Sequence, residues 1–162
     1  MPCFSRRFLV RSGAALAVLS LARCAVQPSA LADMQGDTAL LIAGLRGVLP
    51  ALDATPSSIL PPSDLAALQL NIQEASLFAN DIATAQSEAQ AAAPVQSMAE
   101  AVGGAVRTVD RLRLPPHVRS VFAAADALLP AIAAPVGRPA AVAFYSADQA
   151  RFILRQSAGL AA

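Results

Sequence analysis

The one histidine of this chain, His117, is the side chain best suited to proton transfer near neutral pH. A Ser-His-Asp triad would have to use it, and no Gly-x-Ser-x-Gly turn is present to supply the serine nucleophile. His117 follows Pro115 and Pro116, which are typical of the start of a helix. We therefore interpret it as a surface residue of a first helical turn. The alternative is a small envelope enzyme that uses Asp126 together with His117.

The acidic residues do not form the converging pairs that acid–base catalysis requires. Four of them fall on the polar faces of two expected helices: Glu74, Asp81, Glu88 and Glu100. Asp126 differs, because it lies within the otherwise apolar stretch 121–132. Its neighbours are alanines, so we expect it either to reach solvent or to pair with Arg107 or Arg111.

The sequence also lacks the residues that are typical of metal, cofactor and nucleic-acid sites. One histidine and two cysteines cannot build a His or Cys ligand cluster, and no Gly-rich phosphate loop or dinucleotide fingerprint occurs. The densest basic cluster contains Arg107, Arg111, Arg113 and Arg119. No aromatic residues interleave with it, so nucleic acid is not an expected partner. The sequence therefore predicts no catalytic, cofactor or metal site.

The composition predicts the elements that hold these residues. The chain of 162 residues is 56% hydrophobic and 14% charged, which excludes a wholly disordered protein. Its 39 alanines favour helices. All 12 basic residues are Arg, and four of them precede Asp33, whereas every acidic residue lies from Asp33 onward. Residues 33–162 therefore carry a net charge of −3, from eight Arg and eleven acids.

The first 32 residues have the three-part pattern of a signal peptide. A basic segment ends at Arg11, an apolar run of 11 residues extends from Ser12 to Ala22, and small residues follow. A run of this length is too short for a stable membrane anchor. Ala30 and Ala32 provide the small side chains that signal peptidase requires, which predicts a cut after Ala32. Pro28 should end the signal helix and leave this region extended.

The basic segment resembles the twin-arginine (Tat) export signal. The resemblance is carried by Ser5, Arg6, Arg7, Phe8 and Leu9. The serine and the arginine pair match, Phe8 and Leu9 lie one place early unless Phe8 is the variable position, and Val10 replaces the usual Lys. The resemblance implies export in a folded state by the Tat machinery, processing by signal peptidase and a periplasmic location.

Cys24 offers an alternative form of processing. The segment Leu21-Ala22-Arg23-Cys24 resembles a lipobox, although Arg23 stands where a small residue belongs. Lipidation at Cys24 would make the protein a membrane-anchored lipoprotein. Cys3 and Cys24 both precede Asp33, so residues 33–162 have no thiol or disulfide chemistry in either case.

Apolar residues three and four apart predict an all-α fold. The expected helices cover about 37–53, 63–92, 95–112, 116–134 and 146–157. Their short connections predict a small antiparallel bundle of four to five helices within one domain, 33–162, preceded by a signal-peptide helix. Residues 120–137 could suggest a membrane span, but Asp126 near their middle favours a core helix.

Local residues predict how these helices begin and pack. Ser63 is the expected N-cap of the second helix, and Pro94 should separate the second from the third. Gly103 and Gly104 should let a neighbouring helix approach closely.

The last helix has its own set of polar signals. Ser146 and Gln149 have the spacing of a capping box. Asp148, Arg151 and Arg155 have helical spacings that favour local ion pairs.

The whole layout resembles small uncharacterised Tat-signal proteins of alphaproteobacteria, some of them carried by prophages. That group implies no established activity. We expect an exported, non-catalytic bundle that binds an envelope protein or a membrane surface. The alternative is a lipid-anchored or membrane-active accessory protein linked to phage lysis.

Overall fold

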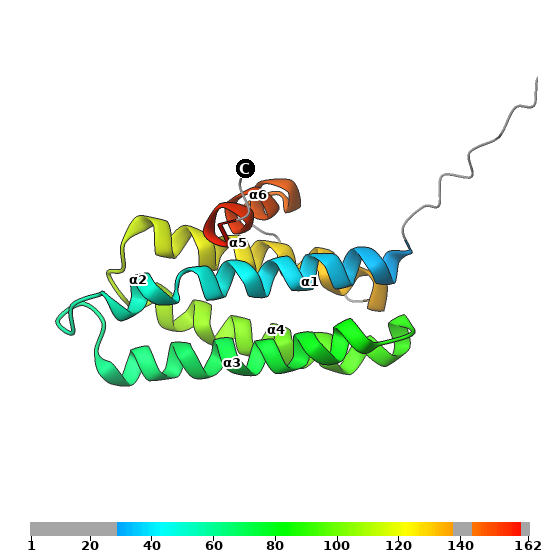
Figure 1. The fold of residues 1–162 in the computed structure, drawn as a ribbon, viewed down its shortest axis with the longest axis horizontal. Helices are drawn as coiled ribbons and strands as arrows, with labels where there is room; N and C mark the ends of the chain where they lie inside the picture. Colours follow the sequence, from blue (N-terminus) through cyan, green and yellow to red (C-terminus); the bar gives the residue numbers. More distant parts are fainter. Residues whose placement is uncertain (1–28, 138–143, 160–162) are drawn as a thin grey trace, which may run out of the picture.

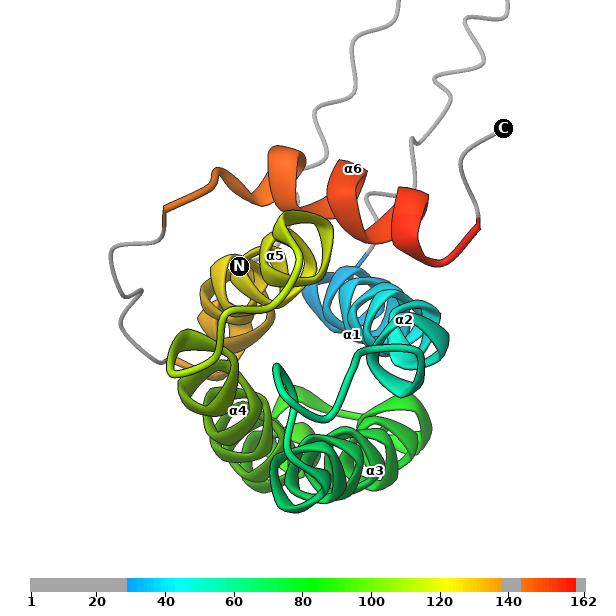
Figure 2. The same ribbon diagram turned by 90° about the vertical axis from the view of Figure 1, so that its left-hand side faces the viewer.

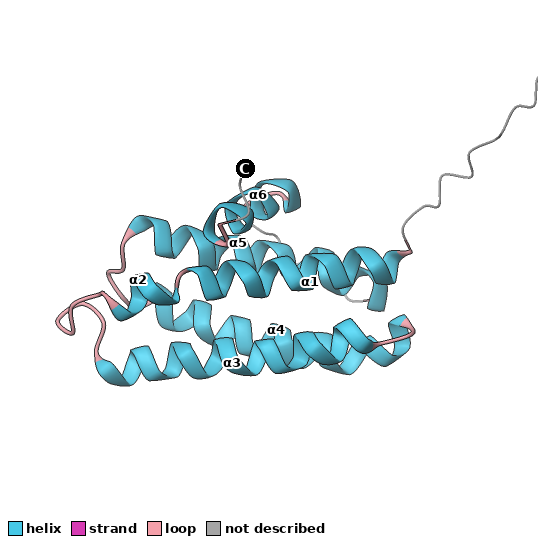
Figure 3. Cartoon of the chain, viewed as in Figure 1, coloured by secondary structure: helices cyan, strands magenta, loops and turns pink. Residues whose placement is uncertain are grey.

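The computed structural model describes residues 29–137 and 144–159, and within these ranges every regular element is a helix (Figure 3). The helices are α1 (Ala30–Gly47), α2 (Leu49–Asp53), α3 (Pro62–Thr84), α4 (Glu88–Asp110), α5 (Pro116–Ala133), the 3-10 helix η1 (Ala134–Val136) and α6 (Ala147–Ser157). The predicted all-α fold is confirmed for this part of the chain. The export-signal residues, the signal-peptide helix and Cys24 lie outside the described residues.

Four long helices form an up-and-down bundle (Figure 1). The view along the bundle shows them in a ring, in which α1 packs against α3 and α5, and α4 packs against the same two helices (Figure 2). The last helix, α6, is shorter, lies outside this ring and crosses α1 and α5 (Figure 2). The helical bundle predicted from the sequence is therefore present, with α6 as an added layer.

The core contains the apolar faces that the spacing predicted. Its largest fully buried side chains include Phe122, Met34, Met98 and Leu128. Alanines fill much of the remainder, with Ala75, Ala91, Ala105, Ala124 and Ala125 almost inaccessible to solvent. Because alanine is small, these positions let the helices pack closely while each buries little apolar area.

The first helix differs from its predicted bounds at both ends. Ser29 is its N-cap, and the hydroxyl of Ser29 accepts a hydrogen bond of 3.2 Å from the amide of Ala32. Ala30 and Ala32, expected in an extended segment, therefore form the first turn of α1. At the other end, Val48 separates α1 from α2, and Pro50 lies in the first turn of α2. A proline tolerates this position because amides there need no intrahelical partner.

The predicted boundary between the second and third helices, at Pro94, was wrong. Ala85 is extended, with φ −63° and ψ 135°, and α4 begins after Ser87, which accepts a hydrogen bond from the amide of Gln90. Pro94, the expected boundary, lies inside α4. Buried Ala91 and Val95 hold the helix against its neighbours on both sides of the proline. Packing therefore outweighs the roughly 3 kcal/mol that an interior proline costs.

Ser63 is not the N-cap of α3, contrary to the prediction. Pro61 occupies that position, Pro62 is the first helical residue, and no side chain caps the turn. Pro115 and Pro116 begin α5 in the same way. The prolines replace a hydroxyl cap because their fixed φ suits the first turn and they have no amide to satisfy.

The predicted close approach at the paired glycines is confirmed at Gly104. A Cβ there would lie 3.0 Å from Oδ1 of Asn71 in α3. At Gly103 the nearest such atom belongs to Arg107 of the same helix, at 3.4 Å. Only the second glycine therefore makes room for a neighbouring helix.

Among the described helices, one is long and apolar enough to cross a membrane by length and composition. It is the stretch Pro116–Val136. In the fold this stretch is partly buried, and α5 packs against α1, α4 and α6. This packing is typical of a bundle core helix.

Candidate functional site

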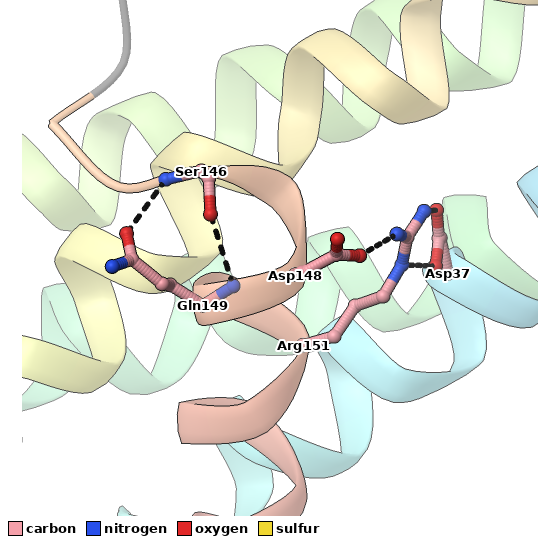
Figure 4. A network of polar contacts seen from close by, with 5 residues as sticks. All are labelled: Asp37, Ser146, Asp148, Gln149 and Arg151. Atoms are coloured by element: carbon pink, nitrogen blue, oxygen red, sulfur yellow. Dashed lines mark hydrogen bonds and ion pairs between the residues drawn. The ribbon is translucent and has the colours of Figure 1, made fainter.

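The start of α6 is fixed by a capping box. The hydroxyl of Ser146 accepts a hydrogen bond of 3.3 Å from the amide of Gln149, and Oε1 of Gln149 accepts one of 3.1 Å from the amide of Ser146 (Figure 4). Two backbone amides that would otherwise lack partners are thereby satisfied. The predicted capping box is confirmed.

Arg151 attaches α6 to α1 through a bidentate ion pair with Asp37 (Figure 4). Its Nε donates to Oδ1 of Asp37 at 2.8 Å, and its Nη2 donates to Oδ2 at 2.7 Å. The Asp37 side chain is 12% exposed. Hydrogen bonding to Asp37 is the main cause that raises the pKa of Arg151, against the opposing effect of burial. The ion pair therefore stabilises the charged guanidinium at the α1–α6 contact.

Arg151 also binds Asp148, within its own helix. Its Nη1 donates to Oδ1 of Asp148 at 2.8 Å, which confirms the predicted local pair. The pair with Asp37 was missed, because the two residues lie 114 positions apart. A signal for it was present, since Asp37 lies three residues after Met34 and four before Leu41, on the buried face of α1. An acid on such a face usually has a partner.

Two glycines of α1 bring the end of α6 into close contact. A Cβ on Gly47 would lie 2.0 Å from the carbonyl oxygen of Ser157, and one on Gly44 would lie 2.5 Å from Cδ2 of Leu154. The hydroxyl of Ser157 donates a hydrogen bond of 2.9 Å to the carbonyl oxygen of Gly44. The spacing Gly44-x-x-Gly47 was the signal that could have predicted this crossing.

The start of α6 and the residues before it form an aromatic patch, defined here as Phe144 and Tyr145, which precede the helix, and Phe152 and Ile153, which belong to it. Phe144 is 90% exposed and Phe152 is 61% exposed. The rings of Phe144 and Tyr145 pack edge to face, with centroids 5.2 Å apart. A shallow hollow of about 420 Å³ is lined by three patch residues together with Asp148 and Gln149. The aromatic patch thus has a polar margin.

A second hollow, of about 610 Å³, lies between α1 and α6. Its lining includes Asp33, Asp37, Arg151 and Arg155. Arg151 is already bonded to both Asp37 and Asp148, so its donors are occupied by protein carboxylates. The aromatic patch is therefore the stronger candidate for contact with a partner.

The residues considered for chemistry lie apart on the surface. His117 is exposed in the first turn of α5, as predicted. The acidic residues of α3 and α4 are exposed: Glu74, Asp81, Glu88 and Glu100. The arginines are exposed too, with Arg107 in α4, Arg111 and Arg113 after its end, and Arg119 in α5. Among the residues that the structure describes, no group of three His, Cys, Asp or Glu side chains could hold a metal ion.

Asp126 is an exposed residue of α5. The ion pairs within 29–137 and 144–159 join Arg151 to two carboxylates, so of the two predicted environments of Asp126 the structure shows the exposed one. Partial burial of its carboxyl and the negative charge of Asp110 raise the pKa of Asp126. This environment disfavours ionisation of the carboxyl.

Comparison of the chain with protein-family models, curated proteins and solved structures finds no match. The chemistry of the described residues, together with the leader sequence, is therefore the basis for a proposed function.

Proposed function

We propose that this protein is an exported, non-catalytic helical bundle of the cell envelope that binds a protein partner through the aromatic patch. The observation that carries this proposal is the exposure of Phe144 and Phe152, at 90% and 61%. Aromatic residues make up 4% of the chain, and three of them lie close together: Phe144 and Tyr145 just before α6, and Phe152 within it. Phe152 also lines the hollow beside the patch. Large exposed aromatic side chains next to a hollow are typical of the energetic centre of a protein interface.

The polar margin of the patch supports a protein partner over a lipid surface. Asp148 and Gln149 lie beside the hollow and can accept hydrogen bonds from a partner. An apolar centre with a polar rim is the usual arrangement of such interfaces. In addition, residues 33–162 carry a net charge of −3, which opposes binding to an anionic bilayer.

The contacts of α6 support a preformed binding surface. The capping box fixes its first turn, Arg151 bonds to α1, and Ser157 bonds to Gly44. A surface that is ordered before binding loses less conformational entropy in the complex. The polar network of α6 therefore contributes to affinity without contacting the partner.

Binding can be tested with a photoreactive amino acid placed at position 152 in growing cells. The matched control places it at position 77 in α3, because Leu77 is 59% exposed, close to the 61% of Phe152. We expect one defined protein adduct from position 152 and none from position 77. The proposal fails if position 152 yields no adduct or if both positions yield the same ones.

Export is supported by Arg6 and Arg7 in the leader, and it has a separate test. We expect the Arg6→Lys, Arg7→Lys double variant to stay in the cytoplasm, while the wild-type protein is recovered from the envelope after cell fractionation. An unchanged distribution of the double variant would contradict export by the twin-arginine route.

A lipid-anchored accessory protein is the second candidate. It is favoured by the folding of Ala30 and Ala32 into α1, because this favours processing upstream, where Cys24 lies. The measurement is the intact mass of the membrane fraction after a high-salt wash, for which an anchor predicts a lipidated N-terminal Cys24.

A further inference from the structure

We infer that the exported precursor is processed N-terminal to Ser29 and that the peptide bond between Ala32 and Asp33 is not the processing site of the folded protein. This inference rests on the proposed export. The small side chains of Ala30 and Ala32 fit signal peptidase by residue type. The fold around them is what excludes the cut.

The Ala32–Asp33 bond lies within the first hydrogen-bonded turn of α1. The amide of Ala32 donates to Oγ of Ser29 at 3.2 Å, and the amide of Asp33 donates to the carbonyl oxygen of Ser29 at 3.1 Å. Signal peptidase holds the residues before the cut in an extended conformation. A cut after Ala32 therefore requires both hydrogen bonds to break and the turn to unwind.

The residues on either side of this bond are anchored to the bundle. Leu31 packs against the core, and Met34 is 1% exposed. One residue further, Nε2 of Gln35 donates to the carbonyl oxygens of Ile82 and Ala85, each at 3.1 Å. The start of α1 is thus bound to the end of α3, and its opening costs more than the fraying of a free helix end.

On the twin-arginine route the precursor folds before it is exported and processed, so the fold of α1 determines what the peptidase meets. A precursor that folds before export presents α1 to the peptidase as a formed helix. Small residues suitable for a cut also occur upstream, at Ser20 and Ala22, and the Cys24 segment lies there too. The mature chain therefore begins at or before Ser29 and retains the whole of α1.

The test is the intact mass of the mature protein purified from fractionated cells that express the full precursor. We expect an N-terminus at or before Ser29. An Asp33 start, or an exported protein that keeps its whole leader, would overturn the inference. Export itself is read from the fraction in which the protein is found, so a failure of export is distinguished from a wrong processing position.

The variant Ala32→Leu is the matched control. Ala32 is exposed and helical, and leucine is compatible with that position in a helix. Leucine at −1 would block a cut after residue 32. We therefore expect the variant to be processed at the same place and rate as the wild type, with accumulation of its precursor as the contradicting result.

A second measurement tests whether the first turn belongs to the folded domain. Proteins that begin at Ser29 and at Asp33 are compared by thermal unfolding. We expect the shorter protein to have a Tm lower by about 4 °C or more, since it loses the N-cap and the packing of Leu31. Equal Tm values would overturn the structural basis of the inference.

Discussion

The hydroxyl of Thr38 is buried in α1, in a residue that is 1% exposed, and finds no hydrogen-bond partner in the described part of the chain. Valine has nearly the same shape without the polar atom. We expect Thr38→Val to raise the free energy of unfolding by about 1 kcal/mol, because the folded state no longer holds an unsatisfied hydroxyl. Urea unfolding monitored by circular dichroism measures the change.

Thr108 in α4 is the control for this prediction. It is 5% exposed, but its hydroxyl donates a hydrogen bond of 3.1 Å to the carbonyl oxygen of Gly104. Thr108→Val should therefore lower the free energy of unfolding by about 1 kcal/mol. Equal effects of the two substitutions would contradict the assignment of an unsatisfied group at Thr38.

The two carboxylates bound to Arg151 differ in burial, which predicts different effects. The side chains of Asp37 and Asp148 are 12% and 91% exposed. We expect Asp37→Asn to lower the free energy of unfolding by about 2 kcal/mol, because it breaks a bidentate charged pair that is partly buried. Asp148→Asn should cost less than about 0.5 kcal/mol. Chemical unfolding of both variants measures the two free energies. A larger loss of stability in Asp148→Asn than in Asp37→Asn would contradict the prediction.

Asp126 provides a prediction of pH dependence. Burial and Asp110 raise its pKa from the ordinary value of 3.8, so the folded protein binds this proton more tightly than the unfolded chain does. Its favourable contribution is complete below the unfolded pKa and is lost as the pH rises through the folded value. We therefore expect Asp126→Asn to be more stable than the wild type at pH 7 and to lose this advantage at pH 3. Urea unfolding at both pH values tests the sign, with the exposed Asp81→Asn as control.

Helix α1 meets α6 through glycines, and this contact predicts opposite effects for two similar substitutions. Gly47→Ala would place a Cβ 2.0 Å from the backbone of Ser157, whereas a Cβ at Gly36 meets nothing within 4 Å. We expect Gly47→Ala to lower the free energy of unfolding by about 2 kcal/mol as α6 is displaced. Gly36→Ala should raise it by about 0.5 kcal/mol through helix propensity. Thermal unfolding measures the stability of both variants against that of the wild type.

The helices show which sequence signals are reliable in this chain. Apolar spacing located the helices and their buried faces, because burial of one side of a helix requires that period. The proline at 94 misled the prediction, since packing of Ala91 and Val95 keeps α4 continuous through it. The true start of α4 was marked by Ser87 and Gln90, which have the same spacing as the capping box that was recognised in α6.

At the scale of the whole molecule, the sequence predicted the bundle but little of the candidate site. Four helices with short connections favour antiparallel neighbours, which made the bundle predictable but not the order of its helices around the ring. The position of α6 depends on contacts between distant residues, such as the pair of Asp37 with Arg151 and the approach of Ser157 to Gly47. The acid on the buried face of α1 and the Gly44-x-x-Gly47 spacing signal that α1 has a partner there, but they do not say which residues of α6 meet them. The exposure of Phe144 and Phe152 could therefore not be derived from spacing.

The place of α6 outside the ring predicts how the molecule opens. Its buried residues are Ala150 and Leu154, whereas α4 buries eight residues between α3 and α5. The free energy that holds α6 in place is therefore a fraction of the stability of the ring. We expect native-state hydrogen exchange to show α6 opening as a separate unit, at lower free energy than α4.

The variant Asp37→Asn tests whether α6 opens separately from the ring. It removes the ion pair that joins α6 to α1 and leaves α4 untouched. At low denaturant concentration, exchange in α6 should become roughly tenfold faster or more, while local exchange in α4 should not change. If the amides of α6 and α4 exchange together in both proteins, α6 belongs to the same cooperative unit as the ring. That result would contradict the separate opening of α6.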